Sequence, residues 1–359
     1  MNDGLSVIVT IQHPAHVHFF KNPIRELQEN GHEVYVFVRE KDIAIDLLEA
    51  YNITYTPIAG EINSTFDAIK EQAKYETNLF RHARRIEPDL LMAIGEPGVT
   101  HVGTLLGAKS VVFTDTEHTK NILLQKIASV PFADLICTPS SFSKDLGGKQ
   151  LSYNGYHELA YLHPDRFSPD RSSLTSNGVN PEDEYYVLRS SAWDAYHDYG
   201  VTGFSREGLQ EIVSILDDRG EVYITSESEL PDTLKPYRLS VPVQHVHDLL
   251  YYADGYVGDS GTMATEAALL GTVAIRFDPS GPEQESGNFL ELEEHGLLFS
   301  TDDEDEAIDK LREVTDDQYA AEVVEGRLNA LLEEKIDVTS FLVDMIESKG
   351  GRKRKKALA

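Results

Sequence analysis

The sequence predicts an α/β protein of two domains, each built on a parallel sheet covered by helices. Three observations support this prediction. The chain has 359 residues, 41% of them hydrophobic, which is long for one core and enough to fill two. Apolar β-branched runs alternate with segments of helical spacing in both halves, as expected for strands joined by helical crossovers. A stretch rich in Pro, Ser, Asn and Asp, residues 153–184, separates the two alternating series.

The first half begins with an apolar run at residues 5–11, followed by the loop HPAHVH. Residues 20–30 then show helical spacing, with Gly31 at the C-cap position. The other expected elements of this half are strands at 33–38, 54–58, 90–94, 110–114 and 134–138, and helices at 42–51, 67–86, 99–107 and 120–130. Near-continuous apolar strands such as 110–114 suit a sheet with both faces covered.

The second half repeats this alternation. The expected elements are strands at 185–189, 221–225, 255–258 and 273–277, helices at 206–219, 246–253 and 262–270, and mostly helix from 304 to 348. We therefore expect two Rossmann-like domains facing a cleft, 1–160 and 161–335. A C-terminal helix and basic tail would follow at 336–359.

The net charge is strongly negative: the chain has 61 Asp and Glu residues but only 32 Lys and Arg residues, which gives −29. The acids are spread along the whole chain, so the surface should repel nucleic acid, and no nucleic-acid partner is expected. Adaptation to very high salt, and hence a halophilic host, is the interpretation we favour. The tail 352–356 is basic, and weak association with an anionic membrane surface or a frayed, solvated terminus both remain open.

Localisation is expected to be cytoplasmic. No window reaches the roughly 18 uninterrupted apolar residues of a membrane span. The N-terminus has no basic region or cleavage site of a signal peptide. The single Cys137 excludes an internal disulfide framework.

The most informative motif lies between residues 254 and 277, where an expected strand ends in Gly258 and a helix opens at Thr262. Gly261 would let a ligand approach the backbone, and the first helical turn offers N–H groups and a positive dipole end to a diphosphate. Ser260 and Thr262 can add hydroxyl donors. Glu266, one turn on, could accept hydrogen bonds from a ribose diol. The alternative is a tight loop, a helix cap and a solvated Glu266.

This motif resembles the donor-binding segment of glycosyltransferase-B enzymes and the D-S-G-G-x-x-E-E-A segment of non-hydrolysing UDP-N-acetylglucosamine 2-epimerases. The run QHPAHVHFFKNPIRELQENGHEV resembles the opening unit of those transferases, which places their N-terminal histidine at His16. Taken together, HPAHVHFF, GEPG, TDTEH and NGYHELAYLHP are similar to the archaeal domain-of-unknown-function family numbered 354. The resemblance implies the glycosyltransferase-B fold over nearly the whole chain. It also implies that 1–160 is the acceptor-side domain and 161–335 the nucleotide-sugar-binding domain.

Further donor contacts are expected in the second half. Arg189 and Ser190 follow its first strand, and an arginine there could hold a diphosphate in bidentate fashion. Gln284 and Asn288 match the transferases' acid-Gln-x-x-x-Asn segment, which the resemblance places against the donor sugar. By contrast, His245 and His247 are expected to mark the start of a surface helix.

Histidines and acids follow the expected strands of the first half. His13, His16 and His18 lie on the loop after the first strand, where one could act as a general base, bind a phosphate, or merely cap the next helix. The spacing also invites a metal, but no second ligand cluster supports one, so no metal site is expected.

Three acids follow the fourth and fifth expected strands: Glu96 after the fourth, and Asp115 and Glu117 after the fifth. The epimerase resemblance places Glu96 and Asp115 against that family's acid/base carboxylates. The chain departs from both motifs and lacks a P-E-E-x-N-R segment. Capping of the following helices is the alternative role.

The leading functional hypothesis is a glycosyltransferase that holds an NDP-sugar, with UDP favoured, and transfers the sugar to an unknown glycan or lipid acceptor. We expect inversion at the anomeric carbon, no cofactor, and independence of metal because no Asp-x-Asp motif stands in a donor position. The alternatives are a nucleotide-sugar 2-epimerase or hydrolase and a non-catalytic sugar-nucleotide-binding protein.

Overall fold

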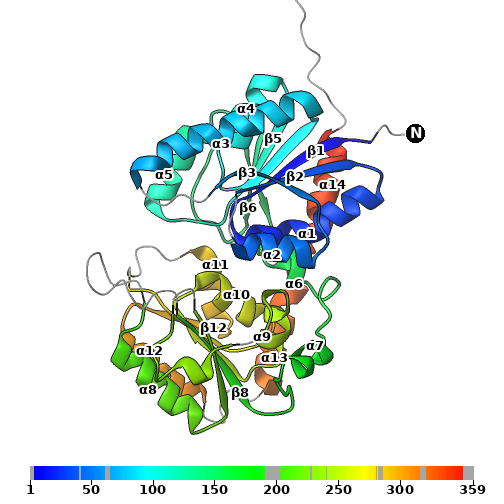
Figure 1. The fold of residues 1–359 in the computed structure, drawn as a ribbon. Helices are drawn as coiled ribbons and strands as arrows, with labels where there is room; N and C mark the ends of the chain where they lie inside the picture. The colour runs from blue at the N-terminus through cyan, green and yellow to red at the C-terminus, as the bar shows by residue number, and fades with distance from the viewer. Residues whose placement is uncertain are drawn as a thin grey trace, which may run out of the picture. The chain divides into compact units, whose positions relative to one another are not determined.

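The computed structural model describes residues 4–39, 42–60, 65–190, 203–226, 229–239, 241–279, 281, 286–315 and 321–350 (Figure 1). The chain divides into two compact units. The first unit is Met1–Arg166 together with Ile336–Ala359, and the second unit is Phe167–Lys335. Each unit has its own parallel sheet with helices packed on it, so the expected two-domain α/β class is confirmed.

The described part of the first unit contains a seven-stranded parallel sheet of order β3-β2-β1-β4-β5-β6-β7. Its strands are β1 (Ser6–Ile11), β2 (Glu33–Arg39), β3 (Tyr55–Ala59), β4 (Leu90–Ile94), β5 (Lys109–Phe113), β6 (Leu135–Pro139) and β7 (Gln150–Tyr153). Six of them match the expected runs. Strand β7 was not expected, because it is a four-residue edge strand with the polar sequence QLSY, which lacks the apolar run of a buried strand.

Helices cover both faces of this sheet (Figure 1). They are α1 (Pro14–Glu29), α2 (Asp42–Ala50), α3 (Thr65–Ile86), α4 (Gly98–Leu106), α5 (Thr119–Ala128), the short α6 (Leu159–Leu162) and α14 (Val338–Gly350). Tyr75 and Leu79 of α3 pack with Val99 of α4 on apolar residues of the central strands, such as Ile8 and Leu91. The C-terminal helix α14 returns to this unit and packs against α1 and α6.

Helix α1 begins earlier than expected, so the prediction of a loop at HPAHVH is wrong. Pro14 occupies the first helical turn, where its fixed φ suits a helix and its missing N–H costs nothing. His13 is the N-cap, and its Nδ1 accepts a hydrogen bond from the Ala15 N–H at 3.2 Å. His16 and His18 therefore lie on the first turns of a helix rather than on a loop.

The described part of the second unit contains a five-stranded parallel sheet of order β12-β11-β10-β8-β9. Its strands are β8 (Tyr185–Ser190), β9 (Glu221–Ser226), β10 (Gly255–Gly258), β11 (Ala274–Phe277) and β12 (Leu298–Thr301). Its helices are α7 (Arg171–Ser176), α8 (Arg206–Asp217), α9 (Val246–Tyr251), α10 (Gly261–Leu269), α11 (Gly287–Glu294), α12 (Glu304–Val314) and α13 (Ala321–Glu333). Two 3-10 turns also occur, η2 (Lys235–Tyr237) and η3 (Val243–His245). The short elements α7, α11 and β12 were not predicted.

The strand order reverses once in each sheet. In the first unit the reversal lies between β1 and β4, and in the second unit between β8 and β10. Loops that leave neighbouring strands on opposite sides of the sheet open a crevice at such a point, and open α/β sheets bind their ligands there. The carboxyl ends of these four strands are thus the places to look for function.

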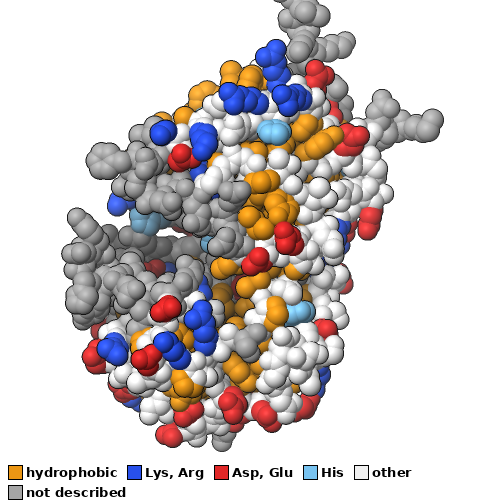
Figure 2. All heavy atoms as spheres, in the orientation of Figure 1, with side chains coloured by type: hydrophobic (Ala, Val, Ile, Leu, Met, Phe, Trp, Pro, Cys, Tyr) orange, Lys and Arg blue, Asp and Glu red, His pale blue; other side chains and the backbone are white. Residues whose placement is uncertain are grey.

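The charge pattern of the surface agrees with the dispersed acids of the sequence. On the face drawn in Figure 2, Asp and Glu side chains are scattered rather than gathered in one patch. None of the helices in the described ranges is both long and apolar enough to cross a membrane.

Candidate functional site

The turn between β10 and α10 is built tightly at the reversal point of the second sheet. Gly258 pairs in register with Arg189 of β8, and a Cβ at Gly258 would lie 2.6 Å from the Arg189 Cβ and 2.9 Å from its carbonyl oxygen. Ser260 is the N-cap of α10, and its Oγ accepts a hydrogen bond from the Met263 N–H at 3.3 Å. Glycine at 258 therefore allows the two strands to approach each other at this edge.

The first turn of α10 offers the expected backbone N–H donors, but Gly261 has a role other than the expected one. The N–H groups of Gly261 and Thr262 have no acceptor within the helix, because the first turn of any helix leaves its donors unpaired there. A Cβ at Gly261 would lie 2.8 Å from Cζ of Phe289 on α11. In this structure, then, Gly261 makes room for the Phe289 ring. Thr262 is half-buried beside it.

Arg189 and Ser190 end β8 next to this turn. Arg189 donates from Nη1 to Thr225 Oγ1 at 3.2 Å, and its carbonyl accepts the Asp259 N–H at 3.4 Å. Ser190 is fully buried, and its Oγ finds no hydrogen-bond partner among the described residues. A buried hydroxyl without a partner lowers stability, so an unsatisfied one at a sheet's reversal point is a candidate ligand contact.

Glu266 does not have the exposed position that a solvated side chain would need. Its Oε1 lies 3.0 Å from Nε2 of His247, and both side chains are almost completely buried, at 5% and 3% exposed. The expectation that His247 marks a surface helix is wrong, because the short helix α9 packs against α10 and turns His247 inward. The two side chains form a buried pair that joins α9 to α10.

Asn288 and Arg276 lie on the elements that follow. Asn288 is the second residue of α11 and is buried, while Gln284 lies outside the described residues. Arg276 was not among the expected site residues, although a lone arginine inside the apolar strand AIRF is an unusual feature of the sequence. Its guanidinium stacks on the Phe289 ring at 4.1 Å and donates to Ser300 Oγ at 2.7 Å. This buried cation stands close to the start of α10, because a Cβ at Gly261 would lie 3.6 Å from its Nε.

In the first unit, the carboxyl end of β5 carries a histidine–carboxylate pair. Nδ1 of His157 lies 3.2 Å from Oδ2 of Asp115. The His157 ring is buried against Phe19, with ring centroids 4.8 Å apart, whereas the Asp115 side chain keeps 26% of its surface exposed. Burial works to raise the pKa of Asp115, but the charge and hydrogen bond of His157 bring it below its ordinary value. Asp115 is therefore ionised at neutral pH and accessible.

The three histidines of the first turns have different surroundings. His16 is half-buried, and its Nδ1 accepts the Gln12 N–H at 3.4 Å. Because that nitrogen acts as an acceptor, neutral His16 carries its proton on Nε2 and presents a donor there. His13 is exposed, and its role as N-cap fixes the same tautomer.

His18 is not brought together with His16, because residues two apart on a helix point in different directions. It is buried, with ring centroids 5.8 Å from Tyr51 and 5.3 Å from Tyr161. Its Nδ1 lies 3.3 Å from the Tyr51 hydroxyl. This packing favours a structural role for His18.

Glu96, after β4, is buried in a polar network. Its Oε1 accepts hydrogen bonds from the Gly98 N–H at 2.8 Å and from Gln72 Nε2 at 2.7 Å. Gln72 in turn accepts from Arg39 Nη2 at 3.2 Å. Burial raises the pKa of Glu96, and these hydrogen bonds offset only part of that effect. Glu96 thus accepts a hydrogen bond from the first turn of α4, and it is a buried carboxyl group with a raised pKa.

Glu117 is buried and holds the segment after β6. Its Oε2 accepts the Ser143 N–H at 2.9 Å and also the Ser143 hydroxyl. Of the acids predicted at this edge, only Asp115 thus combines ionisation with accessibility. Within the described residues, no cluster of three or more His, Cys, Asp or Glu is arranged to hold a metal ion.

Residues 5–347 match the model of a family described as "Protein of unknown function (DUF354)". This chain belongs to the DUF354 family. The DUF354 chain is 22% identical over 289 residues to the uncharacterized protein MJ0665 of Methanocaldococcus jannaschii, covering 77% of this chain and 82% of that protein.

Among solved structures, the DUF354 chain is similar to the spinosyn forosaminyltransferase SpnP, with a TM-score of 0.63, 15% identity, and coverage of 96% and 100% of the two chains. It is also similar to a UDP-N-acetylglucosamine 2-epimerase, with a TM-score of 0.66, 16% identity, and coverage of 99% and 98%. At these identities the likeness shows the fold, and the glycosyltransferase-B architecture expected for DUF354 is confirmed.

Proposed function

We propose that this DUF354 protein is a glycosyltransferase that binds a nucleoside-diphosphate sugar, in the first instance a UDP-sugar, and transfers the sugar to an acceptor hydroxyl of a glycan or lipid. One observation carries the proposal. The start of α10, Arg189 and the buried Ser190 hydroxyl meet at the reversal point of the second sheet. The fold shared with a sugar transferase and a UDP-sugar epimerase supports the same ligand class.

The diphosphate is assigned to the first turn of α10. The N–H groups of Gly261 and Thr262 and the positive end of the helix dipole suit an anion. Arg189 can add a guanidinium from the neighbouring strand, and the Ser190 hydroxyl can donate the hydrogen bond that it lacks among the described residues. Glu266 is held by His247, so any contact with a ribose diol would have to share its carboxylate with that pair.

Acceptor activation is assigned to Asp115. It is ionised, accessible and oriented by His157, which are the requirements of a carboxylate general base. Neutral His16 presents Nε2–H, because its Nδ1 accepts the Gln12 N–H, and it suits the task of donating a hydrogen bond to the acceptor or to a donor phosphate.

A 2-epimerase or hydrolase is the second candidate. Glu96 and Asp115 follow the neighbouring strands β4 and β5, so a shielded acid and an ionised carboxylate stand at one edge of one sheet. Such a pair of unlike carboxyl groups can divide the roles of acid and base between them. The fold likeness to an epimerase supports this candidate equally.

Two measurements separate the candidates. Incubation of the protein with UDP- and GDP-sugars alone should leave the donor largely unchanged if it is a transferase, whereas an epimerase or hydrolase converts the donor without an acceptor. Thermal unfolding with the same nucleotides tests binding itself, because a ligand that binds the native state raises its stability. If no nucleotide shifts the unfolding temperature, the proposed function is wrong.

The variant Ser190→Ala tests the donor site most sharply. Removal of a hydroxyl that lacks a partner among the described residues should leave the unfolding temperature unchanged or higher, yet weaken UDP binding about tenfold if the hydroxyl contacts the ligand. Ser173→Ala is the matched control, because the Ser173 hydroxyl donates to the Asp170 carbonyl at 2.7 Å and lies 3.1 Å from Asp248 Oδ2. That control should lose stability and keep its UDP affinity.

A further inference from the structure

Helix α5 carries apolar side chains on the face opposite its buried one. Leu123, Leu124 and Ile127 are 60%, 60% and 65% exposed, while Ile122 and Gln125 are buried. At about 100° per residue, the three exposed side chains share an arc of about 100° directly opposite the buried pair. The outward face of a helix on the surface of a globular protein is normally polar, so the apolar outward face of α5 is unusual.

Neighbouring side chains extend this apolar face. Leu105, on the last turn of α4, is 72% exposed, and Phe132, in the segment after α5, is 43% exposed. The two segments are tied together, because Thr104 Oγ1 donates to the Phe132 carbonyl at 3.3 Å and the His101 ring meets the Phe132 ring edge to face, with centroids 4.9 Å apart. We call Leu105, Leu123, Leu124, Ile127 and Phe132 the apolar patch.

The chain segment that carries most of the patch is basic, although the whole protein is acidic. Residues 118–133 contain no Asp or Glu, in a chain with 61 such residues, and they include Lys120 and Lys126, both exposed. A third lysine, Lys149, donates from Nζ to the carbonyls of Val130 and Pro131 at 3.1 Å each. An exposed apolar face is thus combined with a local excess of positive charge.

We infer that the apolar patch docks on the surface of an anionic lipid bilayer. Exposed Leu, Ile and Phe side chains can enter the boundary between headgroups and acyl chains, and lysines beside them can meet lipid phosphates. Against a second copy of the patch the lysines of the two copies would face each other, and like charges would oppose that contact. The inference concerns where the protein works and does not depend on the proposed transferase reaction.

Flotation with lipid vesicles tests the inference on the full-length protein. Binding is expected to vesicles of phosphatidylglycerol and phosphatidylcholine and to be weaker with phosphatidylcholine alone. The variant Leu123→Ser/Leu124→Ser/Ile127→Ser should lower binding to the anionic vesicles about tenfold or more, since insertion scales with apolar area. Because these side chains are exposed, its unfolding temperature should stay unchanged. Lys120→Gln/Lys126→Gln should reduce anionic binding toward the level seen with the neutral vesicles.

Matched controls separate the patch from other causes. Ile43→Ser/Val323→Ser removes apolar side chains of 42% and 44% exposure elsewhere on the surface and should leave vesicle binding intact. Replacement of the basic residues 352–356 by Gln tests the C-terminal tail. If that variant abolishes binding while the triple serine variant binds normally, the inference is overturned. It is equally overturned if the triple variant only dissolves a dimer, seen by light scattering, and the protein binds no vesicle.

Discussion

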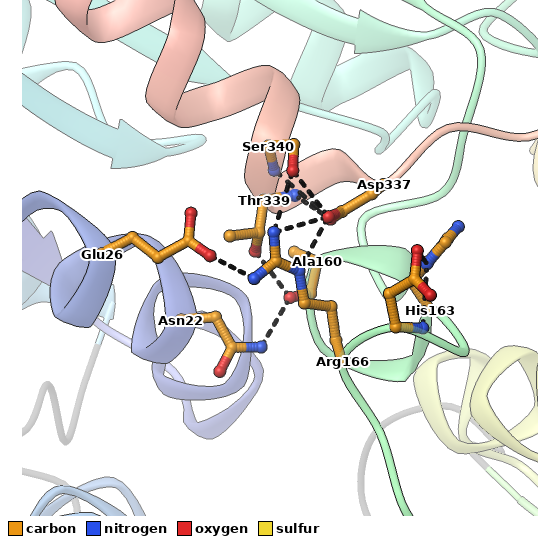
Figure 3. Close-up of polar contacts among 9 residues, drawn as sticks. Asn22, Glu26, Ala160, His163, Arg166, Asp337, Thr339 and Ser340 are labelled. Atoms are coloured by element: carbon orange, nitrogen blue, oxygen red, sulfur yellow. Dashed lines mark hydrogen bonds and ion pairs between the residues drawn. The ribbon is translucent and has the colours of Figure 1, made fainter.

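Arg166 and Asp337 form an ion pair across 171 positions of sequence, with Nε and Nη2 of the arginine 2.7 and 2.6 Å from Oδ2 of the aspartate (Figure 3). Arg166 is the last residue of the first unit before the chain enters the second, and Asp337 is the second residue after the chain returns. One ion pair therefore joins the outgoing and the returning segments of the chain at their junction with the first unit.

The same arginine reaches two helices of the first unit. It donates to Glu26 of α1 and, at 2.9 Å, to the hydroxyl of Ser340 on α14 (Figure 3). Beside it, Asn22 and Thr339 both donate to the carbonyl oxygen of Ala160, at 2.9 and 2.7 Å. These contacts hold the C-terminal helix α14 against the first unit. The other helices and strands of that unit precede α14 in the sequence by more than 150 residues.

Loss of this pair should destabilise the protein. Arg166→Met and Asp337→Asn are each expected to lower the free energy of unfolding by about 1.5–3 kcal/mol, as for hydrogen bonds to charged groups that are mostly buried. Urea unfolding of the two variants and the double variant should give a coupling energy of the same sign. Arg171→Met, which removes a pair whose side chains are 57% and 66% exposed, should change stability by less than about 0.5 kcal/mol.

The pair also predicts a pH dependence. Burial works to raise the pKa of Asp337, but its hydrogen bonds with Arg166 and Ser340 bring the pKa below the ordinary value. A carboxyl whose pKa is lower in the folded state stabilises above its unfolded pKa of about 3.9, and this stabilisation is lost as the pH falls through the folded pKa. Asp337→Asn should therefore cost stability at pH 7 and make a smaller difference at pH 3. An equal cost at both values would contradict the prediction.

Elements with strong local signals were predictable from the sequence. The turn Gly258 to Gly261 combines a strand end, a capping serine and a small-residue helix, and α10 begins within one residue of its expected start. Here local backbone preferences and the fold agree. At α1 a local signal was present but was not used, since Pro14 marks a helix start as clearly as Gly31 marks its end.

Features that depend on distant parts of the chain were not predictable. His247 sits in a helix of six residues, and only the packing of α9 on α10 buries it against Glu266. The strands β7 and β12 are short edge strands with the sequences QLSY and LFST, which lack the apolar run of a central strand. The pairing of His157 with Asp115 joins residues of the expected linker to the end of β5, which no local spacing reveals.

Gly258→Ala should destabilise the second unit, because the new Cβ would meet the Cβ and carbonyl oxygen of Arg189 at 2.6 and 2.9 Å. The backbone of β8 cannot move aside easily, so we expect a loss of about 1–3 kcal/mol. Gly148→Ala is the control, since nothing lies within 4 Å of its Cβ. Thermal unfolding of both variants checks this, and equal unfolding temperatures would show that β8 and β10 are less tightly packed than described.

The buried pair of Glu266 and His247 should matter for stability first. Glu266→Ala leaves His247 buried without this partner, and we expect a loss of about 3 kcal/mol or more in the free energy of unfolding. The double variant with His247→Ala should lose less than the sum of the single losses. Calorimetric titration with UDP separates this role from ribose binding, because a purely structural pair predicts unchanged affinity in any variant that remains folded.

The identity of the base can be decided by the pH dependence of sugar transfer once an acceptor is found. If Asp115 is the base, kcat/KM should stay level from neutral pH down to about 5, because the pKa of this carboxyl lies below its ordinary value. His157→Gln removes the charge that lowers the pKa of Asp115, so it should shift the acidic limb of the pH profile to higher pH.

The variant Asp115→Asn tests the same assignment directly. It should lower kcat about a hundredfold or more while UDP binding is kept. An acidic limb that His157→Gln does not move, together with full kcat in Asp115→Asn, would show that Asp115 is not the base.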